Sequence, residues 1–388
     1  MAVLRVATVI GTRPEATKMA PVVLALRQSP GLTPVIISSG QHRELLPQAL
    51  GVFGLAADAD LGVMTPGQGL EQITSRVLER CVAAFTDLAP DVVLVHGDTT
   101  TTLAAALAAF YCRIPVGHVE AGLRTGERYS PFPEEMNRLL ADRLCEMHFA
   151  PTPLARDNLL REGVAPEGIF VTGNTGIDAV LLVAGPRRRR APGQPRLVLV
   201  EAHRRENLGA PMERIAAGVR ALAQGDPQLE IVWSVHPNPA VSAPVHAALD
   251  GLARVRLISP PGFDAWARLL AEADLLLTDS GGMQEEAPAL GVPVLILRES
   301  TERPEVVQCG AGRLVGTGSE RILAEARMVL DDAAVYRRMA EAGSPFGDGR
   351  AAQRTVQGIL SHMGKRAGRP AEFTSAGRGT AIDRAGSR

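Results

Sequence analysis

Short apolar runs alternate with longer segments of helical periodicity along most of this chain. Such runs are typical of buried parallel strands, and the segments between them are typical of helices that cover both faces of a sheet. The alternation forms two blocks, residues 1–184 and 196–347. We therefore expect an α/β protein with two Rossmann-like parallel-sheet domains that face a central cleft. The expected strands are Leu4–Ile10, Val35–Ser38, Val92–Val95, Val116–Val119, His148–Ala150, Ile169–Thr172, Leu197–Val200, Ile231–Val235, Val255–Ile258, Leu275–Thr278 and Val292–Leu297.

Two segments do not fit this alternation. Residues 185–195 contain two glycines, three prolines and the run Arg187–Arg190, which indicates an exposed linker whose charges favour solubility over phosphate or RNA binding. Residues 364–388 are rich in Gly, Ala, Ser and Arg with little apolar content, so we expect a disordered tail.

Composition restricts the classes of function. Apolar residues make up 46% and charged residues 21%, as in globular proteins, and the formal net charge of −1 predicts neither nucleic acid nor a membrane surface as partner. The four cysteines are scattered without a C-x-x-C motif, and no apolar stretch is long enough to span a bilayer. We expect a cytoplasmic protein without membrane insertion.

Two neighbouring strands of the first block end abruptly in polar residues. Asp98 follows one strand and Glu120 follows the next. Ligands bind at the carboxyl edge of such sheets, so two carboxylates there suggest proton transfer. Glu134, at the start of a helix after a short Pro-rich loop, could reach the same place. The alternative is that the acids cap helices or pair with Arg124.

A metal site is a weaker interpretation of the same strand ends. The patterns His96-x-Asp98 and His118-x-Glu120 place ligand types two residues apart, on one face of a strand. No H-E-x-x-H motif or cysteine cage supports them, so we predict no metal.

The first strand leads into a loop suited to an anion. In the segment Gly11–Lys18, a glycine and a proline precede a helix, and Arg13 and Lys18 add positive charge. The spacing matches neither G-x-G-x-x-G nor a Walker A loop, which argues against a dinucleotide or P-loop site. Lys18 could also be an ordinary surface lysine.

The second block carries matching features. His203 and two arginines follow its first strand, which is typical of a pyrophosphate site, although His203 could be a structural histidine. Farther on, Ser280, Gly281 and Gly282 join a strand to a helix and would let a phosphate approach the backbone. Possible further contacts are Glu286 to a ribose, Arg303 to a phosphate and Trp266 to a base, with core packing as the alternative for Trp266. Together the two blocks predict a nucleotide-sugar enzyme.

These segments closely resemble the non-hydrolysing UDP-N-acetylglucosamine 2-epimerases of bacteria, from about Val3 to Leu360. The resemblance rests on the ordered motifs GTRPEATKMAP, QHRELL, HGDTTTT, GHVEAGLRTG, SPFPEEMNR, HRREN, VHPNP, DSGGMQEEAP, TERPE and PFGDGRAAQR. It implies the GT-B architecture, with a C-terminal helix at about Asp348–Met363 that crosses back to the first domain.

The resemblance also implies roles for individual residues. Positions matching the family's active site are Arg13, Lys18, Asp98, Glu120, Glu134 and His203, and those matching its UDP site are Ser280, Gly281, Gly282, Glu286 and Arg303, with Trp266 where the family usually has a phenylalanine. Positions near a second, activating UDP-N-acetylglucosamine site of some members are Gln41, Glu44, Glu135, Arg205 and His236. Two departures stand out: Glu201 puts an acid beside the phosphate site, and the segment 64–70 lacks an arginine that the regulated members use.

The implied reaction needs no redox cofactor. The hydrogen on carbon 2 of the sugar is not acidic, so UDP must leave carbon 1 before a carboxylate removes that hydrogen. The expected product is UDP-N-acetylmannosamine, made through a 2-acetamidoglucal and used for bacterial surface polysaccharide, by a protein expected to be a homodimer. The alternatives are a hydrolysing 2-epimerase, which would accumulate free sugar, and a GT-B glycosyltransferase, which would need an acceptor surface. A non-catalytic UDP-sugar-binding protein would not need three carboxylates near a pyrophosphate.

Overall fold

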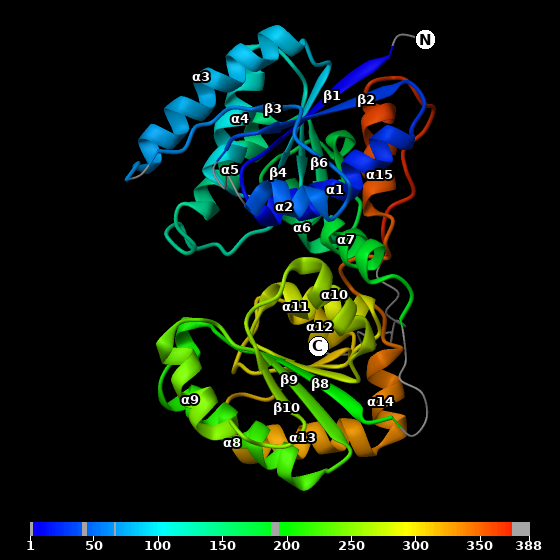
Figure 1. Cartoon of the computed structure of the whole chain (residues 1–388). Helices are drawn as coiled ribbons and strands as arrows, with labels where there is room; N and C mark the ends of the chain where they lie inside the picture. The colour runs from blue at the N-terminus through cyan, green and yellow to red at the C-terminus, as the bar shows by residue number, and fades with distance from the viewer. Residues whose placement is uncertain (1–2, 41–44, 66, 188–193, 375–388) are drawn as a thin grey trace, which may run out of the picture. The chain divides into compact units, whose positions relative to one another are not determined.

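The chain folds into two compact units (Figure 1). The computed structural model describes residues 3–40, 45–65, 67–187 and 194–374. Unit 1 is built from Met1–Val183 together with Phe346–Thr374, and unit 2 is built on Ala184–Pro345. The chain therefore returns to unit 1 after completing unit 2.

Unit 1 contains a parallel sheet of seven strands in the order β3-β2-β1-β4-β5-β6-β7. The strands are β1 (Leu4–Ile10), β2 (Leu32–Ser38), β3 (Ala59–Asp60), β4 (Val92–His96), β5 (Val116–Val119), β6 (Met147–Ala150) and β7 (Ile169–Val171). From β1 the chain first builds outward through β2 and β3 and then returns to place β4 on the other side of β1. In open α/β sheets such a reversal is the switch point where ligands bind.

Helices cover both faces of this sheet, so its strands are buried on both sides. The helices are α1 (Arg13–Gln28), α2 (Leu45–Gly51), α3 (Leu70–Leu88), α4 (Thr100–Tyr111), α5 (Glu134–Leu144), α6 (Pro153–Arg161), α7 (Thr175–Ala184) and α15 (Ala351–His362). Apolar side chains of α1, α2 and α15 share one core with β1, and those of α3 and α4 share another with β4. The C-terminal helix α15 thus completes the core of unit 1 beside α1.

Unit 2 repeats the design with six parallel strands in the order β10-β9-β8-β11-β12-β13. The strands are β8 (Arg196–Glu201), β9 (Leu229–Ser234), β10 (Val255–Ile258), β11 (Leu275–Thr278), β12 (Val294–Ile296) and β13 (Gly312–Leu314). The helices are α8 (Ala210–Gly225), α9 (Pro239–Leu249), α10 (Phe263–Glu272), α11 (Gly281–Ala289), α12 (Pro304–Gln308), α13 (Ser319–Asp331) and α14 (Ala333–Ala340). Its switch point lies between β8 and β11, which pair directly.

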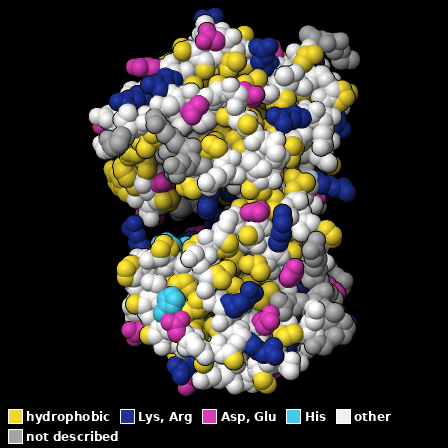
Figure 2. All heavy atoms as spheres, viewed as in Figure 1, with side chains coloured by type: hydrophobic (Ala, Val, Ile, Leu, Met, Phe, Trp, Pro, Cys, Tyr) yellow, Lys and Arg dark blue, Asp and Glu magenta, His cyan; other side chains and the backbone are white. Residues whose placement is uncertain are grey.

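These two parallel sheets with helices on both faces confirm the predicted α/β class with two Rossmann-like domains. No helix in the described parts of the chain has both the length and the apolar character needed to cross a membrane. On the face drawn in Figure 2, acidic and basic side chains are interspersed and neither sign gathers into one large field. That distribution agrees with the formal net charge of −1.

Two expectations about connecting segments need correction. Arg187, expected in an exposed linker, is half-buried and donates to the Tyr336 hydroxyl at 2.6 Å. Residues 364–374, expected to be disordered, lie against unit 1: Phe373 is 3% exposed and its N–H donates to the Val171 carbonyl at 2.8 Å. Arg369 stacks over the Phe170 ring, 4.4 Å from its centroid. These contacts hold Arg187 and residues 364–374 in place. Residues 188–193 and 375–388, which belong to the same two predicted segments, lie outside the described residues.

Candidate functional site

The switch point of unit 1 is held together by a buried carboxylate, Glu15. Thr12 caps α1 and forms a capping box with Glu15. The carboxylate accepts from the N–H groups of Gly11 and Thr12 at 2.7 and 2.6 Å, and from the Thr99 hydroxyl at 2.6 Å. Burial raises the pKa of Glu15, against the effect of these hydrogen bonds. Glu15 therefore ties the turn after β1 to the turn after β4. The T-x-x-E pattern in the sequence was its only signal.

Asp98 stands in the turn after β4, and a guanidinium holds its carboxylate. Arg138 of α5 donates to Asp98 Oδ2 from Nη2 at 2.5 Å and from Nε at 3.0 Å. Asn137 donates to the Asp98 carbonyl at 2.9 Å. The N-cap of α4 is Thr99, so Asp98 does not act as that cap. Asn137 and Arg138 both lie in the SPFPEEMNR motif, but the sequence predicted no role for either residue.

Glu120 follows β5 with an unusual backbone conformation. Its φ is +67°, in the left-handed region that non-glycine residues rarely adopt and that often marks functional sites. Its carboxylate forms an ion pair with Lys18 and accepts from Asn174 Nδ2 at 3.0 Å. His96 Nε2 lies 3.8 Å from the same oxygen. The side chain of Glu120 is 12% exposed, so this carboxylate is largely withdrawn from water.

His96 differs from most buried histidines. Among the residues that the structure describes, neither ring nitrogen has a hydrogen-bond partner. Burial lowers the pKa of His96 to about 4, against the opposing charge of Glu120. His96 is therefore neutral at physiological pH, beside a charged carboxylate.

Glu134 and Glu135 open α5 but differ in their contacts. Glu134 is half-buried and lies one helical turn before Asn137 and Arg138, the two residues that contact Asp98. Residues at this spacing share a helix face, so Glu134 lies on the side of α5 that meets the Asp98 turn. Glu135 is 2% exposed and accepts from the Gly126 N–H at 3.0 Å and from Arg138 at 2.9 Å.

The environment of Glu135 keeps it ionised. Burial would raise its pKa, but the backbone N–H groups of Gly126 and Thr125 and the charge of Arg138 lower it. Glu135 thus anchors the loop after β5. This structural role accounts for its buried position without a second ligand site. Of the other proposed second-site residues, Arg205 and His236 are exposed in unit 2, while Gln41 and Glu44 lie outside the described residues.

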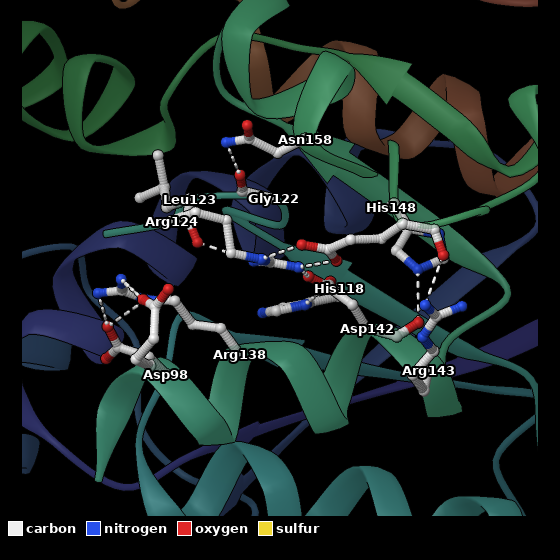
Figure 3. A network of polar contacts seen from close by, with 12 residues as sticks. Asp98, His118, Gly122, Leu123, Arg124, Arg138, Asp142, Arg143, His148 and Asn158 are labelled. Carbon is white, nitrogen blue, oxygen red and sulfur yellow. Dashed lines mark hydrogen bonds and ion pairs between the residues drawn. The ribbon is translucent and has the colours of Figure 1, made fainter. Parts of the chain in front are cut away.

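Arg13 is exposed in the first turn of α1, next to the switch point of unit 1. Arg124, which could have paired with the strand-end acids, instead binds Asp142 and Glu162 at 2.7 Å each (Figure 3). Both ring nitrogens of His118 are also occupied by protein acceptors. Within the described ranges no group of three or more His, Cys, Asp or Glu side chains could hold a metal ion.

The switch point of unit 2 is organised by Asp279, which is fully buried after β11. Its carboxylate accepts from the N–H groups of His203 and Arg204, each at 2.9 Å, and from Asn207 Nδ2 at 2.8 Å. The His203 ring stacks on His236 with centroids 5.5 Å apart. Burial lowers the pKa of His203, and His236 and Arg204 act in the same direction while Asp279 opposes them. Asp279 lies in the DSGGMQEEAP motif and had no predicted role, yet it holds the backbone of the turn after β8.

Two guanidinium groups converge on the N-terminus of α11. A Cβ added at Gly281 would lie 3.5 Å from Arg204 Nη2 and 3.9 Å from Arg303 Cζ. Ser280 is the N-cap residue, and its side chain makes no capping bond. Gly282 follows in the first turn. A helix N-terminus flanked by arginines is suited to a phosphate group. Arg204 is one of the two arginines after His203 that the sequence predicted for a pyrophosphate site.

Other predicted residues of unit 2 lie nearby with different exposure. Trp266 in α10 is 7% exposed and donates its indole N–H to Met283 Sδ at 2.8 Å, so most of its ring is packed in the core. Glu286 lies in α11, one turn beyond Gly282. Glu201 ends β8, and its Oε2 is buried without a hydrogen-bond partner among the described residues. Burial, together with the charge of Asp279, raises the pKa of Glu201 to about 7.

Known proteins match the chain along nearly its whole length. The UDP-N-acetylglucosamine 2-epimerase family model matches residues 24–360. The UDP-N-acetylglucosamine 2-epimerase of Salmonella typhimurium is 49% identical over 372 residues, covering 92% of this chain and 99% of that protein. The enzyme of the same name from Bacillus subtilis is 47% identical over 375 residues, covering 96% and 99%.

The solved structures agree with this assignment. The crystal structure of the UDP-GlcNAc 2-epimerase from Neisseria meningitidis bound to UDP-GlcNAc superposes with a TM-score of 0.80 at 42% identity. The match covers 92% of this chain and 100% of that one. The chain therefore belongs to the UDP-N-acetylglucosamine 2-epimerase family.

Proposed function

We propose that this protein interconverts UDP-N-acetylglucosamine and UDP-N-acetylmannosamine without net hydrolysis. UDP leaves carbon 1 of the sugar, a carboxylate removes the hydrogen from carbon 2, and the intermediate is 2-acetamidoglucal with UDP. Proton delivery to the opposite face of carbon 2 and return of UDP to carbon 1 give the epimer. The product would serve bacterial surface polysaccharide synthesis.

The proposal assigns UDP to the switch point of unit 2. The N-terminus of α11 would bind phosphate through Ser280, Gly281 and Gly282, and Arg303 and His203 would stabilise the departing UDP. Arg13 of unit 1 would add positive charge to the leaving group. Support comes from the convergence of Arg303 and Arg204 on Gly281 and from the Neisseria relative, whose structure is bound to UDP-GlcNAc.

The same proposal assigns proton transfer to unit 1. Epimerisation needs an acid/base group on each face of carbon 2, and Asp98, Glu120 and Glu134 are the candidates. Glu120 is nearly buried and paired with Lys18, while Asp98 is held by Arg138. Carboxylates held in place favour proton transfer, because a positioned base needs no reorganisation of its surroundings during the reaction. This pair of separately held carboxylates at one switch point is the observation on which the proposal depends.

Analysis of the products from UDP-N-acetylglucosamine tests the proposal. We expect UDP-N-acetylmannosamine to accumulate to a constant ratio with its epimer, with no added metal or nicotinamide cofactor. A steady release of free N-acetylmannosamine and UDP would indicate the hydrolysing reaction instead. Product formation only with an added sugar acceptor would indicate a glycosyltransferase.

Variants then test the assignment of residues. We expect Asp98→Asn and Glu120→Gln to lose most turnover while UDP still binds, as measured by calorimetry. Asp157→Asn, which removes an exposed carboxylate on α6, is the matched control and should keep normal turnover. Near-normal rates in both site variants would remove these carboxylates from the mechanism.

A further inference from the structure

A chain of buried charges supports the turn that carries Asp98 (Figure 3). At its inner end is His118 on β5, which has no exposed surface. His118 Nδ1 lies 2.6 Å from Asp142 Oδ1 on α5, and Nε2 lies 2.7 Å from the Gly97 carbonyl oxygen. Asp142 in turn binds Arg124, and Arg124 binds Glu162.

The partners of His118 determine its protonation. A backbone carbonyl can only accept a hydrogen bond, so Nε2 must carry a proton. Asp142 is 2% exposed and is held by Arg124 at 2.7 Å, which favours its ionised form. An ionised carboxylate also only accepts, so Nδ1 must carry a proton as well. A ring with both protons is an imidazolium cation.

The electrostatic environment agrees with this assignment. Burial opposes a charge on His118, but the facing Asp142 carboxylate and the Gly97 carbonyl raise its pKa. Burial likewise opposes ionisation of Asp142, and His118 and Arg124 nevertheless bring its pKa down to about 2. The series His118, Asp142, Arg124 and Glu162 therefore alternates positive and negative charges, which makes burial of the innermost cation possible.

The location of this cation connects the two proposed acid/base groups. Gly97 directly precedes Asp98, and its φ of +68° defines the turn after β4. His118 lies two residues before Glu120, on the neighbouring strand β5. The bond from His118 Nε2 to the Gly97 carbonyl thus joins the ends of the two strands that present Asp98 and Glu120. A neutral ring could make only one of the two hydrogen bonds as donor.

We propose that His118 is a permanent imidazolium that acts as a positioning residue for the epimerisation, by fixing the Asp98 turn relative to Glu120 through its bond to the Gly97 carbonyl. This inference rests on the proposed function. It concerns a residue that touches neither UDP nor sugar in the proposed assignment.

Nuclear magnetic resonance of the intact protein with ¹⁵N-labelled histidine tests the protonation directly. At pH 7 we expect one buried histidine with two ring N–H protons in slow exchange, and its loss in His118→Gln. A His118 ring with a single N–H at pH 7 would overturn the inference. This measurement does not depend on turnover, so it is separable from failure of the proposed function.

Two substitutions distinguish the two ends of the ring. The amide nitrogen of His118→Gln can replace Nε2 and keep the Gly97 bond, whereas that of His118→Asn can replace Nδ1 and keep only the Asp142 bond. We expect His118→Asn to lower kcat by about 10–100-fold, since small displacements of reacting groups have effects of that size. His118→Gln should retain most of kcat, and both variants should keep the KM for UDP-N-acetylglucosamine.

His148 provides the matched control. It pairs in register with His118, is 2% exposed and contacts Asp142 through the backbone carbonyl at 2.8 Å, away from the Asp98 turn. His148→Asn should destabilise unit 1 without the loss of kcat. Equal losses of kcat in His118→Asn, His118→Gln and His148→Asn would show a merely structural role and overturn the inference.

Discussion

Glu201 allows the electrostatics of unit 2 to be tested by one substitution. It ends β8 with a side chain that is 22% exposed, and its Oε1 lies 3.8 Å from His203 Nδ1. Burial and the charge of Asp279 raise its pKa from 4.5 to about 7. The folded chain therefore holds a proton on Glu201 at pH values where the unfolded chain has lost it.

The sign and size of the effect follow from this difference. Between pH 4.5 and 7 the folded state binds more protons than the unfolded state, so the free energy of unfolding falls as the pH rises. Above pH 7 the loss is complete and amounts to about 3 kcal/mol. Glu201→Gln removes the titrating group, so the variant should gain up to ~3 kcal/mol over wild type at pH 8 and little at pH 5.

Tryptophan fluorescence during urea unfolding measures this gain in unit 2 alone, because Trp233 and Trp266 are the only tryptophans of the chain and both lie in that unit. Glu213→Gln removes an exposed acid of α8 and should show no pH-dependent gain. If Glu201→Gln changes stability equally at pH 5 and pH 8, or destabilises unit 2 at pH 8, the reasoning is refuted.

Three further predictions concern unit 1. Because burial lowers the pKa of His96 from 6.5 to about 4, the stability of unit 1 should fall as the pH drops from 6.5 to 4. Thermal unfolding of His96→Gln should lack this decline, and a decline identical to that of the wild type would contradict the prediction. Glu15→Ala leaves two N–H groups of the β1–α1 turn without an acceptor and should cost about 2–4 kcal/mol in chemical unfolding, whereas Glu15→Gln should cost less; equal losses would refute the acceptor role. Arg138→Lys cannot bridge Asp98 and Glu135 as the guanidinium does, so kcat should fall about tenfold with little change in KM; an unchanged kcat in steady-state assays would refute the bridge.

The sequence pattern predicted the elements that apolar periodicity defines. Both parallel sheets and the placement of Asp98 and Glu120 at the ends of β4 and β5 follow from apolar runs that stop at polar residues. Strands β3 and β13 were missed, because they have only 2 and 3 residues and no apolar run of their own. Short edge strands depend on pairing with a neighbour, which periodicity does not reveal.

The supporting residues of the site were harder to predict than the strand-end acids. Glu15, Arg138 and Asp279 act through partners that are distant in sequence, such as Thr99 for Glu15 and Asn207 for Asp279. Glu15 and Arg138 lie in helices and not at strand ends. Asp279 follows β11 directly, but its position does not reveal the N–H groups of His203 and Arg204 that it binds. The alternative prediction that the strand-end acids pair with Arg124 was wrong for the same reason. The partners of Arg124 are Asp142 of α5 and Glu162 at the end of α6, and the sequence carries no local signal for either pair.

Exchange at carbon 2 is the most direct test of the proposal that carboxylates of unit 1 transfer a proton on a UDP sugar. The protein is incubated with UDP-N-acetylglucosamine in D₂O, and carbon 2 of each recovered sugar nucleotide is examined by proton NMR. We predict deuterium at carbon 2 in UDP-N-acetylmannosamine and, with time, in UDP-N-acetylglucosamine, and a strong loss of exchange in Glu120→Gln. Epimerisation by the wild-type protein with carbon 2 remaining protonated would contradict this account.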